Sequence, residues 1–332
     1  MYKRVVVPQS NKREERKMNV AKKVLKIVLA VFLALIMLIL LVWGGLNLFK
    51  PLIYGEFFSI DSVICKNPGL NDGFVCQGIA VDEQSGKVIV SGYMKDDSAS
   101  RIYVTDKDNN VRYVTLSNGG KPFTGHMGGI AIGRDSVYFP SGSKLVVVPL
   151  ADVLNENTKD IDIAGKTIAM MHSISCVFAN EENLYIGQFH DGGKYVIEGH
   201  EMETAEGTHY AFVTCYDLDD LTTPTHIYSV RDRVQGFCMT PDGQAVLSTS
   251  YGLTSSVYYV YDTNGLQVDT QFEGIDVYFL DHCQRQFSGP AMSEDLDYSN
   301  GLVVTFSESA SDKYIFGKFF FADKVYGLDL NK

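Results

Sequence analysis

QGIAVDEQSGKVIVSGY (Gln77–Tyr93) and QGFCMTPDGQAVLSTSY (Gln235–Tyr251) are two stretches of equal length that align without a gap. Both begin with Gln-Gly, carry a Gly-containing turn between two apolar runs, and end with Tyr. Two short β-like runs joined by such a turn are typical of an antiparallel hairpin. A hairpin that recurs in one chain indicates an array of similar structural units.

Five units can be aligned along the chain. Their first strands begin with Gly-x-Ala/Cys or a variant of it, at 78–80, 129–131, 174–176, 236–238 and 289–291. A second β-like run follows a turn at 87–91, 136–140, 183–187, 245–249 and 301–305. A third run, often closing on Asp, lies at 101–106, 144–150, 212–218, 257–262 and 324–330. A weaker fourth run lies at 110–116, 159–165, 225–230 and 266–272.

Repeated units of four antiparallel strands predict an all-β fold, a five-bladed β-propeller spanning residues 56–332. The fifth unit has only three runs before the chain stops at Lys332. The stretch EFFSIDSVI (56–64) is expected to supply its fourth strand and to close the ring by pairing with the C-terminal strand. Closure of this kind removes the exposed sheet edges of the first and last blades.

The strand pattern of residues 56–330 resembles the extracytoplasmic propellers of bacteria and is loosely similar to the gluconolactonase, strictosidine-synthase and NHL-type superfamily. The resemblance implies a ring of blades around a central channel. Those relatives mostly have six or seven blades, whereas five are counted here, so no active-site residue is carried over from them.

An uncharged run of 23 residues, Ile27–Phe49, is long enough to cross a bilayer as a helix. Nine Lys and Arg residues and two Glu residues precede it, which predicts a cytoplasmic basic tail (1–26) and an extracytoplasmic domain joined to the anchor by a linker (50–55). A cleaved signal peptide is the alternative, although its apolar core would be about 7–15 residues.

Charge restricts the partners of the extracytoplasmic part. The whole chain carries −11, but without its basic tail the net charge is −18. A domain of this charge is a poor binder of nucleic acid or anionic lipid. We therefore expect a protein or glycan partner in the cell envelope, with the membrane contacted through Ile27–Phe49.

The six cysteines divide by position. Cys176 and Cys238 occupy the small apolar position of the first strand, where a free thiol behaves as a small hydrophobe. Cys65 and Cys76 bracket a loop containing Pro and Gly, which leaves a disulfide open. Cys215 and Cys283 are not assigned.

Side chains at the start of each first strand and the end of each second strand should converge on one face of a propeller, at the mouth of its channel. The expected ligand-binding residues are Gln77, Tyr93, Phe189, Asp191, Gln235 and Tyr251. The candidates for catalysis or for holding a divalent metal are His126, His172, His190 and Glu308.

Three functions fit this set of residues. The first is recognition of a peptide, glycan or partner protein by the aromatic and polar side chains. The second is a hydrolase or lyase, lactonase-like, in which a histidine and a carboxylate exchange protons. The third is the same chemistry with a bound divalent metal. A purely structural role for the buried polar groups remains the alternative to all three.

Several enzyme classes lack their sequence signatures. The chain contains no GxSxG, no Walker-type loop, no HExxH and no CxxC. Serine hydrolases, nucleotide-binding enzymes and zinc peptidases of the common types are therefore not indicated.

Overall fold

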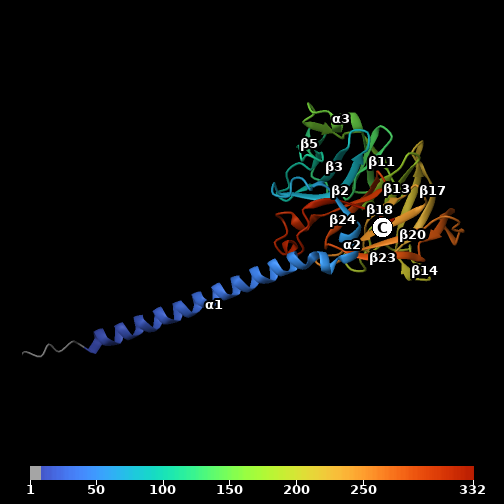
Figure 1. Cartoon of the computed structure of the whole chain (residues 1–332). Helices are drawn as coiled ribbons and strands as arrows, with labels where there is room; N and C mark the ends of the chain where they lie inside the picture. The colour runs from blue at the N-terminus through green and yellow to red at the C-terminus, as the bar shows by residue number, and fades with distance from the viewer. Residues whose placement is uncertain (1–8) are drawn as a thin grey trace, which may run out of the picture. The chain divides into compact units, whose positions relative to one another are not determined.

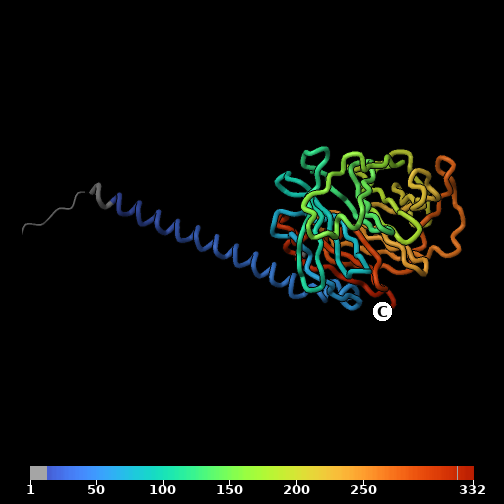
Figure 2. Tube along the Cα trace, turned by 90° about the horizontal axis from the view of Figure 1, so that it is seen from above, coloured from blue at the N-terminus to red at the C-terminus, as the bar shows by residue number. Residues whose placement is uncertain are grey.

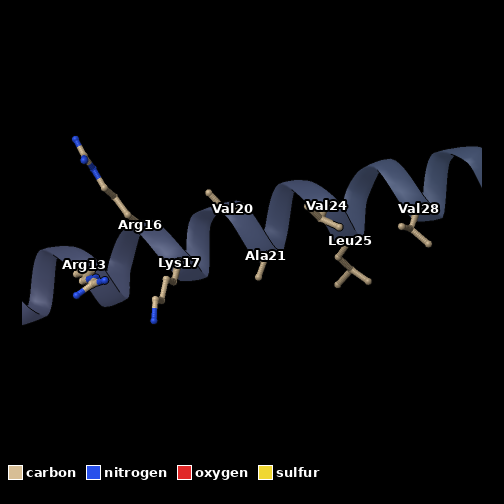
Figure 3. Close-up of a pocket in the computed structure, with 8 residues that line it drawn as sticks. All are labelled: Arg13, Arg16, Lys17, Val20, Ala21, Val24, Leu25 and Val28. Carbon is tan, nitrogen blue, oxygen red and sulfur yellow. The ribbon is translucent and has the colours of Figure 1, made fainter.

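The computed structural model describes residues 9–332 and divides into two compact units, residues 1–49 and 50–332. The first unit consists of helix α1 (Gln9–Ile53), which continues into the first residues of the second. Figure 3 shows three basic residues of α1 giving way along the helix to apolar ones: Arg13, Arg16 and Lys17, then Val20, Ala21, Val24, Leu25 and Val28. Residues 13–53 are long and apolar enough to cross a membrane, a composition that signal sequences share.

The second unit is an all-β propeller of five blades, which confirms the predicted fold class. Its innermost strands contact one another in a closed ring, β2 to β7, β12, β18, β24 and back to β2. Figure 2 shows the chain passing around this domain in sequence order, from blue and green through yellow to red. The labelled strands can be followed in Figure 1.

Each blade is an antiparallel sheet built outward from the ring. Blade one contains β2 (Phe74–Asp82), β3 (Lys87–Met94), β4 (Arg101–Thr105) and β5 (Val111–Asn118), with β6 (Lys121–Pro122) beside β5. Blade two contains β7 (Ala131–Gly133), β8 (Ser136–Ser141), β9 (Lys144–Pro149) and β11 (Thr167–Ala169). Blade three contains β12 (Cys176–Ala179), β13 (Asn183–Gly187), β16 (Ala211–Asp217) and β17 (Asp220–Val230). Blade four contains β18 (Val234–Met239), β19 (Gln244–Thr249), β20 (Ser256–Asp262) and β23 (Cys283–Gly289). Blade five contains β24 (Ser293–Ser299), β25 (Leu302–Ser307), β26 (Lys324–Leu328) and β1 (Asp61–Lys66).

Short elements lie between the blade strands. They are α3 (Leu150–Leu154), the hairpin β14 (Met202–Thr204) and β15 (Gly207–His209), and the 3-10 turns η1 (Glu308–Ala310) and η2 (Phe316–Phe320). We call the face on which the inner strands begin the top face, and the opposite one the bottom face.

Two of the predicted fourth strands were wrong. The run 159–165 contains β10 (Asp160–Asp162), which pairs in parallel with β5 of blade one. The run 266–272 contains β21 (Thr270–Phe272), which with β22 (Ile275–Phe279) extends the outer edge of blade three. Each run leaves its own blade and completes the edge of the preceding one, so the true outer strands of blades two and four, β11 and β23, come later in the chain.

The ring is closed as predicted, although the closing strand begins later. β1 pairs antiparallel with the C-terminal strand β26. Residues 56–60, expected to be part of this strand, instead belong to helix α2 (Gly55–Ile60), because Phe57 and Ile60 bury the same helical face. Phe57 packs against Tyr258 of blade four and Tyr326 of blade five, with ring centroids 5.7 and 5.3 Å away.

The repeated Gln-Gly marks a β-bulge in blades one and four. The register of each inner hairpin shifts by one residue between Cys76 and Gly78 and between Val234 and Gly236. The glycine that follows each bulge lies against the next inner strand of the ring. A Cβ added at Gly78 would lie 2.5 Å from the backbone of the blade-two strand. Only glycine therefore fits there.

Blade five has the same bulge, and its first strand begins later than predicted. The sequence 289–291 lies at the end of β23, while β24 shifts register between Ser293 and Leu296. Glu294-Asp295 thus takes the place of Gln-Gly. Asp295 is fully buried, and its Oδ2 accepts the backbone N–H of Ile79 at 3.3 Å and of Ile130 at 3.0 Å. One carboxylate thereby joins blade five to blades one and two.

The six cysteines, all within the described part of the chain, are free thiols. Cys176 and Cys238 are buried in inner strands, as expected. Cys65 and Cys76 do not form the disulfide that the sequence left open. Burial raises the pKa of the Cys65 thiol to about 12, which keeps it in the unreactive protonated form.

Candidate functional site

The centre of the top face is occupied by Gln77, Glu294 and Glu308. Gln77 Nε2 donates a hydrogen bond to Glu308 Oε2 at 2.8 Å, and the carboxyl groups of Glu308 and Glu294 are hydrogen-bonded to each other. Only 6% of Glu294 and 8% of Glu308 is exposed. The structure thus brings together Gln77 and Glu308, both predicted site residues, on the top face.

The two glutamates share a proton. Burial, followed by the charge of Glu308, raises the pKa of Glu294 well above its ordinary value. Burial also raises the pKa of Glu308 to about 7, against the lowering effect of its hydrogen bond to Tyr314 and of the positive Lys313. Two buried carboxyls in contact cannot both ionise without a large penalty. The pair can therefore gain or lose a proton near neutral pH.

A group of aromatic and basic side chains continues from this pair toward blade two. The Tyr93 and Tyr314 hydroxyls are 3.5 Å apart, and Lys313 Nζ lies 4.4 Å from the centre of the Tyr93 ring. Tyr93 also stacks on His126 with ring centroids 4.7 Å apart. Burial and the positive Lys313 and Lys194 lower the pKa of His126 to about 4, so this imidazole is neutral at pH 7.

The other two candidate histidines lie in separate surroundings. His172 packs against His200, Phe212 and Phe272, with centroids 4.7, 6.0 and 5.9 Å away. His190 Nδ1 is 2.7 Å from Asp232 Oδ1, and its ring stacks on that of Tyr210 at 4.7 Å.

The donor arrangement does not fit the metal site considered from the sequence. His126, His172, His190 and Glu308 have different sets of neighbours. Within residues 9–332, no group of three or more His, Cys, Asp or Glu side chains is placed to hold a metal ion.

The top face of blades three and four carries the remaining predicted residues. Asp191 Oδ1 accepts the backbone N–H of Gly193 and Tyr195, both at 2.8 Å, which fixes the turn after His190. These N–H groups lower the pKa of Asp191. Phe189 meets the Tyr195 ring edge to face at 5.5 Å. The two aromatic rings and Asp191 therefore build one local surface.

Tyr93 and Tyr251, aligned in sequence, do not occupy equivalent positions. In blade one, Gly78 of the innermost strand pairs with Ser91 of the second strand. In blade four, Gly236 pairs with Ser248, so the two paired residues are one position closer in the sequence. The blade-four turn is one residue shorter, so the equivalent of Tyr93 is the buried Ser250. Tyr251 lies one place further on and is 47% exposed. Gln235 keeps its predicted place as the bulge residue of blade four and is half-buried.

Several residues at the top face were not predicted. Glu294 could have been found by aligning SEDLD (293–297) with CQGIA (76–80), since Glu294 then matches Gln77. Lys313, Tyr314 and Arg233 lie in connecting segments outside the repeat pattern, and no periodicity marks them.

A further cavity of the propeller lies on the bottom face. It has a volume of about 660 Å³ and is lined by the turns at the bottom of all five blades, with acidic residues including Glu83, Asp135, Glu181 and Asp297. Asp297 accepts the Val81 N–H at 2.7 Å, and burial raises its pKa to about 7.

No family model and no curated protein matches the chain. Solved structures that match include β-propeller proteins. One is the PQQ-bound form of aldose sugar dehydrogenase from Streptomyces coelicolor, 16% identical, with TM-score 0.39 and 74% of this chain and 78% of that chain covered. Another is the GH43_1 enzyme from Xanthomonas citri complexed with xylose, 11% identical, with TM-score 0.45 and 82% and 92% covered. The chain spans 55% of the length of hydrazine synthase from Kuenenia stuttgartiensis, which is 10% identical with TM-score 0.37 and 70% of this chain covered. Likenesses at this level concern the fold alone.

Proposed function

We propose that this chain is a membrane-anchored extracytoplasmic binding module whose top face holds a protein, peptide or glycan of the cell envelope. The observation that carries the proposal is a set of four tyrosine rings, each with a cation over it. Lys313 lies over Tyr93, Lys194 over Tyr195, Arg233 over Tyr251 and Arg231 over Tyr259, at 4.4, 4.9, 4.9 and 3.6 Å from the ring centres. Tyrosine and arginine are the residues that most often dominate binding surfaces.

The proposal that the propeller lies outside the cell rests on the basic residues that precede the apolar part of α1. Nine basic residues against two acidic ones precede Ile27, and basic segments are retained on the cytoplasmic side. The propeller follows the helix in the chain and would emerge on the other side.

Ligand binding requires a less exact placement of the top-face side chains than acid–base catalysis does. His126 is neutral and stacked, while His172 and His190 are engaged with other partners. A general base has to reach the proton that it removes, either directly or through one water. These three imidazoles do not converge on one point, whereas the ring and cation pairs need no such convergence.

The test uses the full chain in detergent micelles on a glycan and peptide array. We expect hits that are lost in the double variant Tyr93→Ala/Tyr251→Ala and kept in Arg134→Gln. Arg134 is a matched control because it is an exposed residue on the bottom face. An array without hits, or hits that disappear only in Arg134→Gln, would contradict a binding role of the top face.

Acid–base catalysis by a hydrolase or lyase is the second candidate, and the Glu294–Glu308 pair favours it. A carboxyl whose pKa is about 7 can both donate and accept a proton at neutral pH. Turnover of a lactone or glycoside panel that is abolished in Glu308→Gln, with binding retained, would replace the binding proposal with this one.

A further inference from the structure

The top face of blade four contains a cavity that the repeat pattern did not indicate. It has a volume of about 450 Å³ and is bordered by Arg231, Arg233, Tyr251, Tyr259, Thr254 and Ser255 among others. This size falls within the range of about 300–1,000 Å³ that is usual for small-molecule sites. Two guanidinium groups, two tyrosine rings and several hydroxyl groups therefore surround one hollow.

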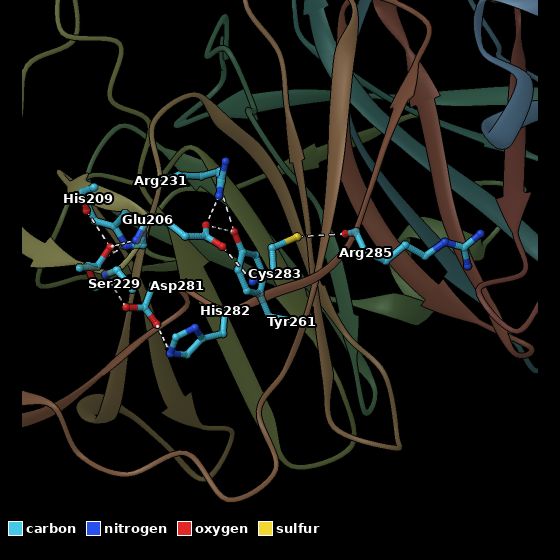
Figure 4. A network of polar contacts seen from close by, with 12 residues as sticks. Glu206, His209, Ser229, Arg231, Tyr261, Asp281, His282, Cys283 and Arg285 are labelled. Atoms are coloured by element: carbon cyan, nitrogen blue, oxygen red, sulfur yellow. Dashed lines mark hydrogen bonds and ion pairs between the residues drawn. The ribbon is translucent and has the colours of Figure 1, made fainter.

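The two arginines of the cavity have different surroundings. Arg231 is held in place, because its Nε donates to the Tyr261 hydroxyl at 3.0 Å and its guanidinium pairs with Glu206, as Figure 4 shows. Glu206 also accepts from Tyr261 at 3.1 Å and from the Cys283 N–H at 2.8 Å. The charge of Arg231 is thus compensated within the fold.

Arg233 keeps its charge available. Its side chain is exposed, and in the part of the chain that the structure describes it forms no ion pair with an acidic residue. The guanidinium lies 4.9 Å from the centre of the Tyr251 ring. A guanidinium stacked on a ring still presents its N–H groups at its edge, where they can form two parallel bonds to a carboxylate.

The one acidic side chain of the cavity is already engaged. Asp232 is bonded to His190, with 2.7 Å between Oδ1 and Nδ1. Arg233 is therefore the cation of the cavity lining that is left to pair with a ligand, and a single guanidinium suits one carboxylate group.

We infer that this cavity is a binding subsite for one acidic sugar unit, whose carboxylate pairs with Arg233. The inference rests on the proposed binding role of the top face and names the ligand class. Tyr251 and Tyr259 supply flat amphipathic rings for a sugar ring, and the hydroxyl groups of Thr254 and Ser255 can bond to those of the sugar. A glutamate side chain would use Arg233 equally but would leave the rings and hydroxyl groups without partners.

The experiment measures binding of trigalacturonic acid to the full chain in detergent micelles, with galactotriose and triglutamate as comparison ligands. We expect trigalacturonic acid to bind at least tenfold more tightly than either, and its affinity to fall as salt is added. Arg233→Gln should reduce this affinity about tenfold or more, Arg233→Lys less, and the bottom-face control Arg134→Gln not at all. Thermal unfolding should be unchanged in Arg233→Gln, since its side chain is exposed.

Equal affinity for galactotriose, equal affinity for triglutamate, or an unchanged affinity in Arg233→Gln would each overturn the inference. Failure of trigalacturonic acid to bind would also overturn it. The proposed function would survive that failure if array hits lost in Tyr93→Ala/Tyr251→Ala were still present, and it would fall only if those hits were absent too.

Discussion

Gly78 and Gly236 lie where two neighbouring inner strands of the ring approach each other. A Cβ at Gly236 would lie 2.6 Å from the backbone nitrogen of Leu296, which is closer than real Cβ contacts. The glycine of the repeated Gln-Gly is thus needed for packing between blades. Its Gln is free to vary in chemistry, as Glu294 shows in blade five.

We predict that Gly78→Ala and Gly236→Ala each lower the free energy of unfolding by about 1–3 kcal/mol, because the added methyl group meets backbone rather than a flexible side chain. Gly55→Ala is the control, since no heavy atom lies within 4 Å of its Cβ position. Chemical denaturation of the three variants tests this, and a Gly236→Ala protein as stable as Gly55→Ala would contradict the packing argument.

The Glu294–Glu308 pair should make the propeller less stable as the pH rises. The folded pKa of Glu308, about 7, lies above the value of about 4.3 expected in the unfolded chain. The folded protein therefore binds more protons than the unfolded one between these values, so stability is lost as the pH rises through 7. Asp297 acts in the same direction, while the lowered pKa of His126 acts in the opposite one.

We predict that Glu308→Gln removes part of this dependence, on the order of 1–3 kcal/mol between pH 5 and 8. Urea denaturation at several pH values measures it. The wild type and the variant are compared at each pH, so that the contributions of groups not coupled to Glu308 cancel and the difference reports on the Glu294–Glu308 pair. Parallel curves for the two proteins would show that Glu308 does not titrate in this range.

At the scale of the elements, most strands could be predicted from sequence, whereas the outer strands of blades two and four and the start of the innermost strand of blade five could not. Second strands such as β3 are buried and flanked by turn residues, so their apolar runs are visible in the sequence. β10 and β21 have only three residues each, and their sheet is decided by contacts with another blade. The same limit applied to the site: repeat positions revealed Gln77 and Glu308, whereas Lys313 and Arg233 lie in segments without a repeat.

β1 should be needed for the whole propeller to fold. We predict that replacing 61–66 by a Gly-Ser segment of equal length leaves the edge of β26 unpaired and costs about 3 kcal/mol or more. The matched replacement of Lys121–Pro122, an exposed two-residue strand, should cost little. Cooperative unfolding at the wild-type midpoint in the first variant would show that blade five is stable with three strands.

At the scale of the whole molecule, the helix and the propeller fit a protein held at a membrane by its N-terminal part. Residues 13–53 are long and apolar enough to cross a bilayer. In the propeller, pairing of β1 with β26 closes the ring. A ring junction without unpaired strand edges offers no template for pairing with other chains.

We predict that a protease added to intact cells digests a tag placed after Lys332 but not one placed before Met1. The basic residues before Ile27 are the reason, and changing six of them to Glu should reverse or abolish the pattern. Release of the propeller into the medium would instead indicate that the apolar segment is removed as a signal peptide.

Asp295 has a consequence for how the chain is made. It belongs to the last blade to be synthesised, yet its carboxylate is the acceptor for backbone groups of Ile79 and Ile130 in the first two. Strand β26, the partner of β1, emerges later still. Until β24 and β26 have been synthesised, the early blades lack both the Asp295 acceptor and the closing partner of β1. The ring can therefore close only after β26 has been synthesised, so the five blades form a complete propeller late in synthesis.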